Sequence, residues 1–247
     1  MHIGILQTGR VNERLVGDWG EYPPMVAAMF APVAPDFTFS TWAAVDGDIP
    51  DDPTLCDGWV LPGSRHGVYD PLPWIAPLKG FIRDIRAAGR PMVGICFGHQ
   101  IIAAALGGAA EKVDHGWGVG RHRYAVAARP SWMADAGDEL ALYCSHQDQV
   151  TAIPDNATTL AGNAHCPHAM IAFGDPEHPA AVTVQAHPEY PRGYADGLYE
   201  VLRWKGNIAA EQAASAIAST ATPVEGQTVA GWFATYLRRS AEASRAA

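Results

Sequence analysis

One cysteine of the chain lies where the local sequence could activate a nucleophile. Cys96 follows a short apolar segment, 91–95, in the pattern Gly94-x-Cys96-x-Gly98, and an apolar segment with helical spacing begins directly after it. A strand that turns sharply into a helix presents a nucleophile at the turn, and the N-terminus of the helix stabilises a thiolate there. Cys96 could equally be a small apolar residue that fills the end of a core strand. The pattern by itself leaves both interpretations open.

The segment Ala186-His187-Pro188-Glu189 supplies a base and a carboxylate that would complement Cys96. Residues at positions i and i+2 of an extended chain project to the same side, and a proline holds the residue before it in an extended conformation. Glu189 would therefore lie beside His187 and orient its imidazole. His187 would accept the thiol proton and later return it to a leaving amine. The two segments together indicate cysteine-dependent acyl transfer, a chemistry that requires no cofactor.

Both segments resemble motifs of a known family, the class I (triad) glutamine amidotransferases. The matching sequences are Gly-Ile-Cys-Phe-Gly-His-Gln around Cys96 and Gln-Ala-His-Pro-Glu ending at Glu189, and the resemblance extends over about residues 40–195. It implies that Cys96, His187 and Glu189 form a catalytic triad. It also implies hydrolysis of a γ-glutamyl amide, glutamine to glutamate and ammonia, through a γ-glutamyl thioester.

The same resemblance implies an oxyanion hole and a substrate site. In the sequence Leu-Pro-Gly-Ser, Gly63 matches the residue that supplies one oxyanion amide, and the second amide would come from Phe97. The implied substrate contacts are Ser64, Gln100, Ser145, His146, Gln147 and Asp148. The segment 145–148 could instead be only a polar turn at the end of a strand. The residues that follow the oxyanion segment, 65–70, could line the mouth of the site or form an exposed loop.

The sequence leaves the fate of the released ammonia open. The chain has neither a Gly-x-x-x-x-Gly-Lys-[Ser/Thr] phosphate loop nor a Ser-Gly-Gly-x-Asp segment typical of an ATP pyrophosphatase. Either a separate synthetase subunit supplies that half of the reaction, or the protein acts alone. The motifs are also similar to those of stand-alone γ-glutamyl peptidases, which implies γ-glutamyl peptides or amines as alternative substrates. An inactive binding or regulatory module is a third interpretation, which the intact triad positions disfavour.

Composition and charge narrow the class of protein. The chain has 247 residues, 48% of them hydrophobic and 17% charged, and a net charge of −9. This charge disfavours nucleic acid and anionic membranes as partners, and no apolar segment reaches the roughly 20 residues that a bilayer span needs. The first residues, 1–7, are expected to form a strand and not a secretory signal. The four cysteines (Cys56, Cys96, Cys144 and Cys166) show neither disulfide nor zinc spacing, so we expect a cytoplasmic protein without a metal.

Strand-like and helical segments alternate along the chain and predict an α/β fold. We expect a central, mostly parallel sheet flanked by helices, flavodoxin-like as the resemblance implies, with the active site at the carboxyl ends of its strands. The shorter strands in the middle are expected to be antiparallel additions. Expected strands are 2–7, 37–42, 57–61, 91–95, 116–126, 140–144, 158–161, 170–173 and 181–185; expected helices are 22–30, 71–88, 97–106, 192–204, 207–219 and 222–243.

Two parts of the chain are distinguished by this pattern. Residues 1–205 are expected to form the glutamine amidotransferase-like domain, and residues 206–247 a C-terminal helical extension packed on it. Thr222 and Pro223 are expected to be the N-cap and first residue of the last helix, since proline favours the first helical position. The apolar face of this helix is expected to dock on the body of the domain.

Overall fold

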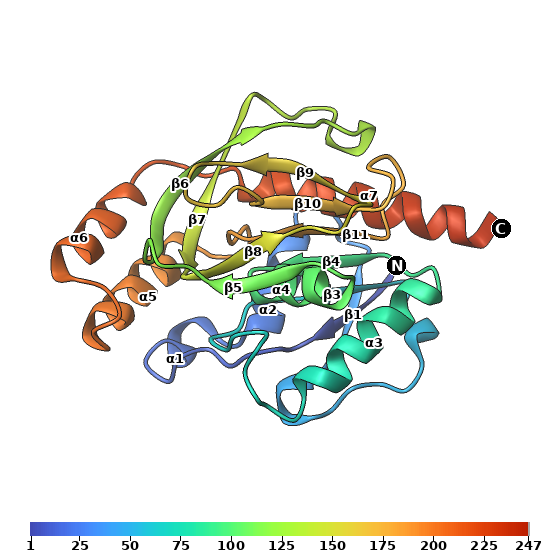
Figure 1. Ribbon diagram of the computed structural model, residues 1–247, viewed down its shortest axis with the longest axis horizontal. Coiled ribbons are helices and arrows are strands. Elements are labelled where there is room, and N and C mark those ends of the chain that lie inside the picture. Colours follow the sequence, from blue (N-terminus) through green and yellow to red (C-terminus); the bar gives the residue numbers. More distant parts are fainter. Residues whose placement is uncertain (247) are drawn as a thin grey trace.

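The computed structural model describes residues 1–246, which form a large sheet with helices on both faces (Figure 1). One half of this sheet is parallel. The expected parallel core of an α/β fold is therefore confirmed. In spatial order its strands are β2 (Thr38–Trp42), β1 (His2–Leu6), β3 (Gly58–Leu61), β4 (Met92–Ile95) and β11 (Ala181–Val184).

The other half of the sheet is antiparallel, as expected for the middle of the chain. It continues from β11 through β10 (Met170–Phe173), β9 (Ala157–Gly162), β6 (Gly118–Val126) and β7 (Glu139–His146). A separate two-stranded ladder pairs β5 (Ala109–Lys112) with β8 (Asp148–Ala152). This ladder was not predicted, because its strands are short and their burial follows no clear period of two.

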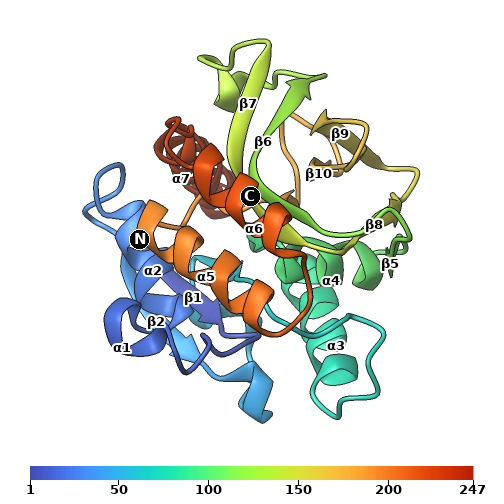
Figure 2. The same cartoon turned by 90° about the vertical axis from the view of Figure 1, so that its left-hand side faces the viewer.

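Helices cover the two faces of the parallel half (Figure 2). On one side lie α2 (Tyr22–Phe30) and α7 (Gly226–Ala246), and on the other lie α3 (Ile75–Ala87) and α4 (Phe97–Ala105). Successive strand residues point to opposite faces: Val93 packs with the α2 and α7 side, whereas Met92 packs with the α3 and α4 side. Burial on both faces is characteristic of a parallel sheet.

Within residues 1–246, no helix has both the length and the apolar composition that a bilayer span requires.

The remaining helices lie at the end of the molecule toward which β1 runs (Figure 1). They are α1 (Val16–Trp19), α5 (Arg192–Trp204) and α6 (Ala210–Ser219). Because β1, β3, β4 and β11 are parallel, their carboxyl ends share this end of the sheet. The loops that follow β3, β4 and β11 carry the predicted catalytic segments, so α5 and α6 stand beside the expected site.

The predicted start of the last helix is wrong. Thr222 and Pro223 precede α7, which begins at Gly226. Glu225 explains the delay, because its N–H donates to the Ala141 carbonyl at 2.9 Å and its carboxylate accepts the Ala141 N–H at 2.7 Å. This pairing with β7 holds the chain outside the helix until Gly226. The apolar face of α7 does dock on the sheet, while the division of the chain at residue 205 stays a prediction.

Candidate active site

Cys96 lies on the tight turn between β4 and α4. Its backbone has φ 53° and ψ −104°, and within residues 1–246 it is the one non-glycine residue with a positive φ. A conformation of this kind costs of order 1–3 kcal/mol. Hydrogen bonds on both sides maintain it: Cys96 N–H donates to Val184 O at 2.9 Å, and Gln100 N–H donates to Cys96 O at 3.0 Å. The backbone strain therefore falls on the predicted nucleophile, at the positive end of a helix.

Gly98 allows this turn to pack directly against β3. A Cβ added at Gly98 would overlap the Leu61 carbonyl oxygen. We expect Gly98→Ala to displace α4, to lower the free energy of unfolding by about 1–3 kcal/mol, and to reduce activity because Cys96 moves with the helix. Gly231→Ala is the matched control on α7, since nothing lies within 4 Å of its added Cβ and alanine favours a helix by roughly 1 kcal/mol. Urea unfolding measures both variants, and equal stabilities would contradict this account.

The segment after β11 holds His187 beside Cys96. His187 N–H donates to Tyr143 O at 2.9 Å, and its ring Nδ1 lies 2.8 Å from Glu189 Oε1. The Tyr190 ring stacks on the imidazole at a centroid distance of 3.8 Å, and the Cys96 side chain lies close enough to act on the imidazole electrostatically. All of these residues are buried. The imidazole is thus fixed by a backbone bond, a carboxylate and an aromatic face, with the cysteine nearby.

The neighbours of His187 decide its protonation state. Burial by itself would lower the pKa of His187, but Glu189 and Cys96 outweigh burial and raise the pKa of His187 to about 10. The imidazole is therefore cationic at neutral pH in the resting site. An adjacent imidazolium stabilises a cysteine thiolate, the nucleophilic form of the residue. The geometry can therefore support nucleophilic attack by Cys96 and proton transfer by His187.

The two predicted oxyanion residues also lie next to the cysteine. Gly63 follows β3, and a Cβ added there would lie 3.8 Å from Cys96 Cβ. Phe97 is the first residue of α4, so its N–H has no acceptor within the helix. The hydroxyl of Thr8 fixes the Gly63 loop, because it donates to Pro62 O at 2.9 Å and to Gly63 O at 3.2 Å. The structure thus places both predicted residues beside Cys96, while their role as oxyanion donors stays a prediction.

Two cavities meet at Cys96. The larger has a volume of about 260 Å³ and is mostly polar; the smaller has a volume of about 100 Å³ and includes His187. The segment after Ser64, which the sequence left open between a site mouth and an exposed loop, contributes Arg65, His66, Tyr69 and Asp70 to the larger cavity. The larger cavity is also lined by all six predicted substrate residues, Ser64, Gln100, Ser145, His146, Gln147 and Asp148.

The side chains of Gln100 and His146 bind the protein itself. Gln100 Nε2 donates to Asp148 O at 2.9 Å and to Gln185 Oε1 at 3.1 Å, and His146 Nδ1 lies 3.0 Å from the same Asp148 oxygen. Both side chains are buried. They therefore fix the turn between β7 and β8, where the sequence indicated a polar strand-end turn, and this turn forms one wall of the larger cavity.

A histidine cluster behind this wall was not foreseen from the sequence. The His165 ring lies 4.5 Å from His115, 5.5 Å from His122 and 5.8 Å from His146, measured between ring centroids. Burial, together with the neighbouring histidines, lowers the pKa of both His146 and His165, so these two rings are neutral at neutral pH. Within the described residues, no group of three or more His, Cys, Asp or Glu is arranged to hold a metal ion.

Other lining residues carried no signal in the sequence. Lys112 on β5 and Asn207, which precedes α6, line the larger cavity, and Trp117 lines both cavities. Each comes from a segment without a motif, and an isolated tryptophan ordinarily packs in a core. Tyr69 contributes more than lining, because its hydroxyl donates to Asp148 Oδ2 at 2.8 Å. Only the folded chain brings these residues to the cysteine.

Comparison with known proteins supports the family that the motifs resemble. Residues 46–199 match the model of the family described as glutamine amidotransferase class-I. The chain is 31% identical over 166 residues to γ-glutamyl peptidase 3 of Arabidopsis thaliana, a match that covers 64% of each chain. It is also 34% identical over 139 residues to the glutamine-hydrolysing GMP synthase of Aromatoleum aromaticum, covering 53% of this chain and 25% of that one. The chain thus spans less than two thirds of the length of these relatives.

A solved structure shares the fold over nearly the whole chain. A glutamine amidotransferase from Thermotoga maritima superposes with a TM-score of 0.75 at 20% identity, covering 98% of this chain and 99% of that one. An identity this low supports the fold alone. The family match includes the elbow of Cys96 and the segment of His187 and Glu189, and it spans more than half of the sequence. The chain therefore belongs to the class I glutamine amidotransferase family.

Proposed function

We propose that this chain hydrolyses γ-glutamyl amides through a thioester on Cys96, with His187 and Glu189 completing a triad. The observation that carries the proposal is the position of Cys96 at the junction of two cavities, beside a cationic His187 that is held by Glu189. A nucleophile, a proton carrier and an orienting carboxylate in contact are the arrangement that covalent acyl transfer needs.

In this mechanism the Cys96 thiolate attacks the γ-carbonyl carbon, and the carbonyl oxygen becomes an oxyanion. The amides of Gly63 and Phe97 stabilise that oxyanion, and one such donor is typically worth about 10²–10³ in kcat. The C–N bond then breaks as His187 gives its proton to the leaving nitrogen. Water, deprotonated by the now neutral His187, attacks the thioester, which releases the γ-carboxylate and frees Cys96 for the next turnover.

The larger cavity would hold the glutamyl part of the substrate. Its lining includes the cations Arg65 and Lys112 and the carboxylates of Asp70 and Asp148, groups that complement an α-carboxylate and an α-amino group. The backbone of the turn 145–148 would add hydrogen bonds, because Gln100 and His146 hold it in place. In this role Gln100 and His146 act as positioning residues.

Two versions of this activity differ in what leaves. As a glutaminase, the chain would release ammonia to a separate synthetase subunit, and one of its relatives is a glutamine-hydrolysing GMP synthase. As a stand-alone enzyme, it would cleave larger γ-glutamyl compounds, and several relatives at 27–31% identity are γ-glutamyl peptidases. The second cavity beside His187 favours a leaving group larger than ammonia.

The four cysteines are free in the described residues, which is consistent with a reducing cytoplasm.

Glutamate release by the purified chain tests the proposal. Glutamine, γ-glutamyl dipeptides and a γ-glutamyl alkylamide are supplied separately, and a Cys96→Ala variant serves as the blank. We expect Cys96-dependent release without any partner, faster from the alkylamide than from glutamine. Release from glutamine only after a synthetase is added would favour the subunit role. No release above the blank from any γ-glutamyl compound would refute the proposal.

A further inference from the structure

The two cavities at Cys96 differ in chemistry. The larger is charged and polar, as described above. The smaller is mainly apolar, and its apolar side chains come from three separate parts of the chain: α2, the loop before β6, and the segment from Tyr190 through α5. The residues that give it this character are Tyr22, Trp117, Tyr190, Leu198 and Leu202.

The position of His187 decides which cavity receives the leaving group. In the proposed mechanism His187 protonates the nitrogen that departs, so this nitrogen and its substituent lie on the His187 side of Cys96. His187 lines the smaller cavity, whereas Gln100 and Asp148 line the larger one. The glutamyl part therefore occupies the polar cavity, and the substituent of the amide nitrogen enters the apolar one.

The walls of the smaller cavity offer little to a charged substituent. Burial raises the pKa of both Tyr22 and Tyr190, so both phenols are neutral at physiological pH. Among the described lining residues outside the triad, Arg65 carries a charge, but it is exposed and shared with the larger cavity. A volume of about 100 Å³ is well below the few hundred Å³ of a typical ligand pocket. The cavity thus suits a short, uncharged apolar group.

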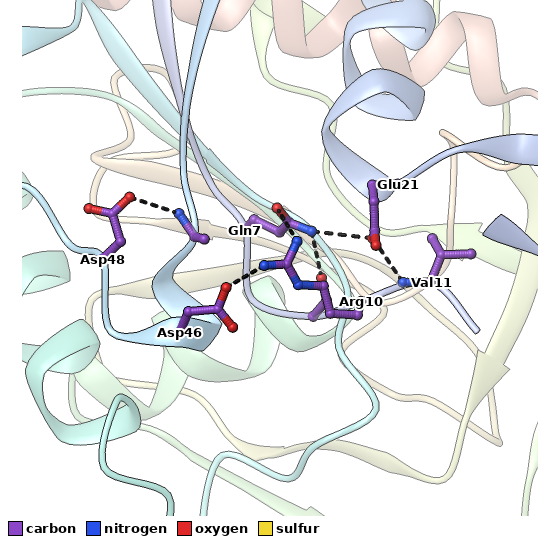
Figure 3. Close-up of polar contacts among 8 residues, drawn as sticks. Gln7, Arg10, Val11, Glu21, Asp46 and Asp48 are labelled. Carbon is purple, nitrogen blue, oxygen red and sulfur yellow. Dashed lines mark hydrogen bonds and ion pairs between the residues drawn. The ribbon is translucent and has the colours of Figure 1, made fainter. Parts of the chain in front are cut away.

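Contacts around Tyr22 and Tyr190 fix these walls. The neighbouring Glu21 accepts hydrogen bonds from Val11 N at 2.9 Å and from the Gln7 side chain at 3.3 Å, which ties the start of α2 to the loop after β1 (Figure 3). Within the wall, the Tyr194 hydroxyl donates to the Tyr22 hydroxyl at 3.4 Å. Tyr190 is held in place by the His187 imidazole, on which it stacks. The cavity is therefore built in advance and does not need the substrate to form it.

We propose that the preferred substrates are γ-glutamyl amides whose nitrogen carries a small, uncharged apolar substituent, such as a short alkylamide. The inference rests on the proposed function and specifies its substrate class. Burying one methylene in an apolar pocket discriminates by about tenfold or more in kcat/KM. Glutamine, which has no substituent, would leave this cavity without an apolar occupant. A γ-glutamyl peptide would bring a carboxylate, whose desolvation there is unfavourable.

Two substrates of nearly equal size separate shape from charge. γ-Glutamyl isobutylamide and γ-glutamylglycine both carry a methylene followed by a three-atom branch, which is apolar in the first and a carboxylate in the second. We expect kcat/KM for the isobutylamide to exceed the values for γ-glutamylglycine and for glutamine by about tenfold or more. γ-Glutamylputrescine, with a cationic substituent, is also expected to be poor. Glutamate release is measured for all four compounds.

Variants of Leu198 connect this preference to the cavity. Leu198→Ala is expected to lower kcat/KM for the isobutylamide by a larger factor than for glutamine, because only the substituted amide reaches the side chain. Leu198→Arg is expected to move the preference toward γ-glutamylglycine. Leu55→Arg, at a side chain that is 52% exposed and lies outside both cavities, is the control and should keep the wild-type ranking.

The outcomes separate the two proposals. Activity on glutamine or γ-glutamylglycine equal to or above that on the isobutylamide would overturn the apolar subsite and leave the γ-glutamyl hydrolase proposal standing. The same holds if Leu198→Ala lowers kcat/KM for the isobutylamide and glutamine by the same factor. Hydrolysis of none of the four compounds would overturn the proposed function, and the subsite with it.

Discussion

Replacing Cys96 with alanine is expected to reduce kcat by about 10⁴ or more, without unfolding the protein. Cys96 is the one cysteine among the described residues that line the two cavities, so its loss removes the thiol that would form the acyl intermediate. The side chain is small, and its removal leaves the hydrogen bonds of the Cys96 backbone to Val184 and Gln100 in place. Glutamate release and urea unfolding are measured on the same preparation. Wild-type turnover in a folded variant would remove Cys96 from the mechanism.

The strained backbone at this position gives the Cys96 experiment a second readout. Because φ is 53°, Cys96→Gly relieves a conformation that alanine retains. Glycine adopts positive φ without a steric penalty, and we expect Cys96→Gly to be about 1 kcal/mol more stable than Cys96→Ala. Both variants should be inactive. A glycine variant less stable than the alanine variant would show that the strain costs little here.

Replacing His187 with glutamine is expected to have the second largest effect, a loss in kcat of about 10⁴ or more, since triad members act as a unit. Glu189→Gln keeps the shape of the partner and removes its charge, so it should cost less, roughly 10²–10⁴. Glutamate release from one γ-glutamyl substrate is compared for the two variants and the wild type. A Glu189→Gln loss that exceeds the His187→Gln loss would contradict an orienting role for Glu189.

The pKa of His187 predicts a pH dependence of stability as well. In the folded protein the pKa of His187 is raised to about 10, whereas an unperturbed histidine titrates near 6.5. A raised folded-state pKa contributes stability that is complete below the unfolded value and is lost as pH rises through the folded one. The stability difference between wild type and His187→Gln should therefore shrink from pH 6.5 to pH 10. Urea unfolding across this range measures it, and a difference that grows with pH would contradict the charge assignment.

The sequence predicted the parallel half of the sheet well because its strands and helices are marked by strong local signals. Strand β4 is uniformly apolar, and the glycines around Cys96 mark a tight turn. A glycine is required at position 98, because a side chain there would overlap Leu61. The α3 helix shows apolar residues at helical spacing, all on the buried side. In these segments local preference and tertiary packing favour the same structure, which is the condition for reliable inference from one sequence.

Elements that depend on distant partners were missed or misplaced. The start of α7 was set by Glu225 pairing with Ala141, a contact between residues 84 positions apart, and proline at position 223 gave a false start signal. The β5–β8 ladder likewise exists because two short segments meet across the chain. The apolar cavity is of the same kind, since Tyr22, Trp117 and Leu198 come from unrelated segments. Motif spacing predicted the reacting residues, whereas the side chains around the leaving group became visible only in the fold.

The covalent intermediate is the most direct test of the central claim. The wild-type chain is mixed with a γ-glutamyl alkylamide, quenched in acid within the first turnovers, and digested for mass spectrometry. We predict that the peptide containing Cys96 gains the mass of one glutamyl group, and that Glu189→Gln accumulates more of this adduct if thioester hydrolysis slows more than its formation. The Cys96→Ala chain should carry none. The account would be contradicted if the wild type released glutamate with no adduct on Cys96 at any quench time, and if Cys96→Ala released glutamate at the same rate as the wild type.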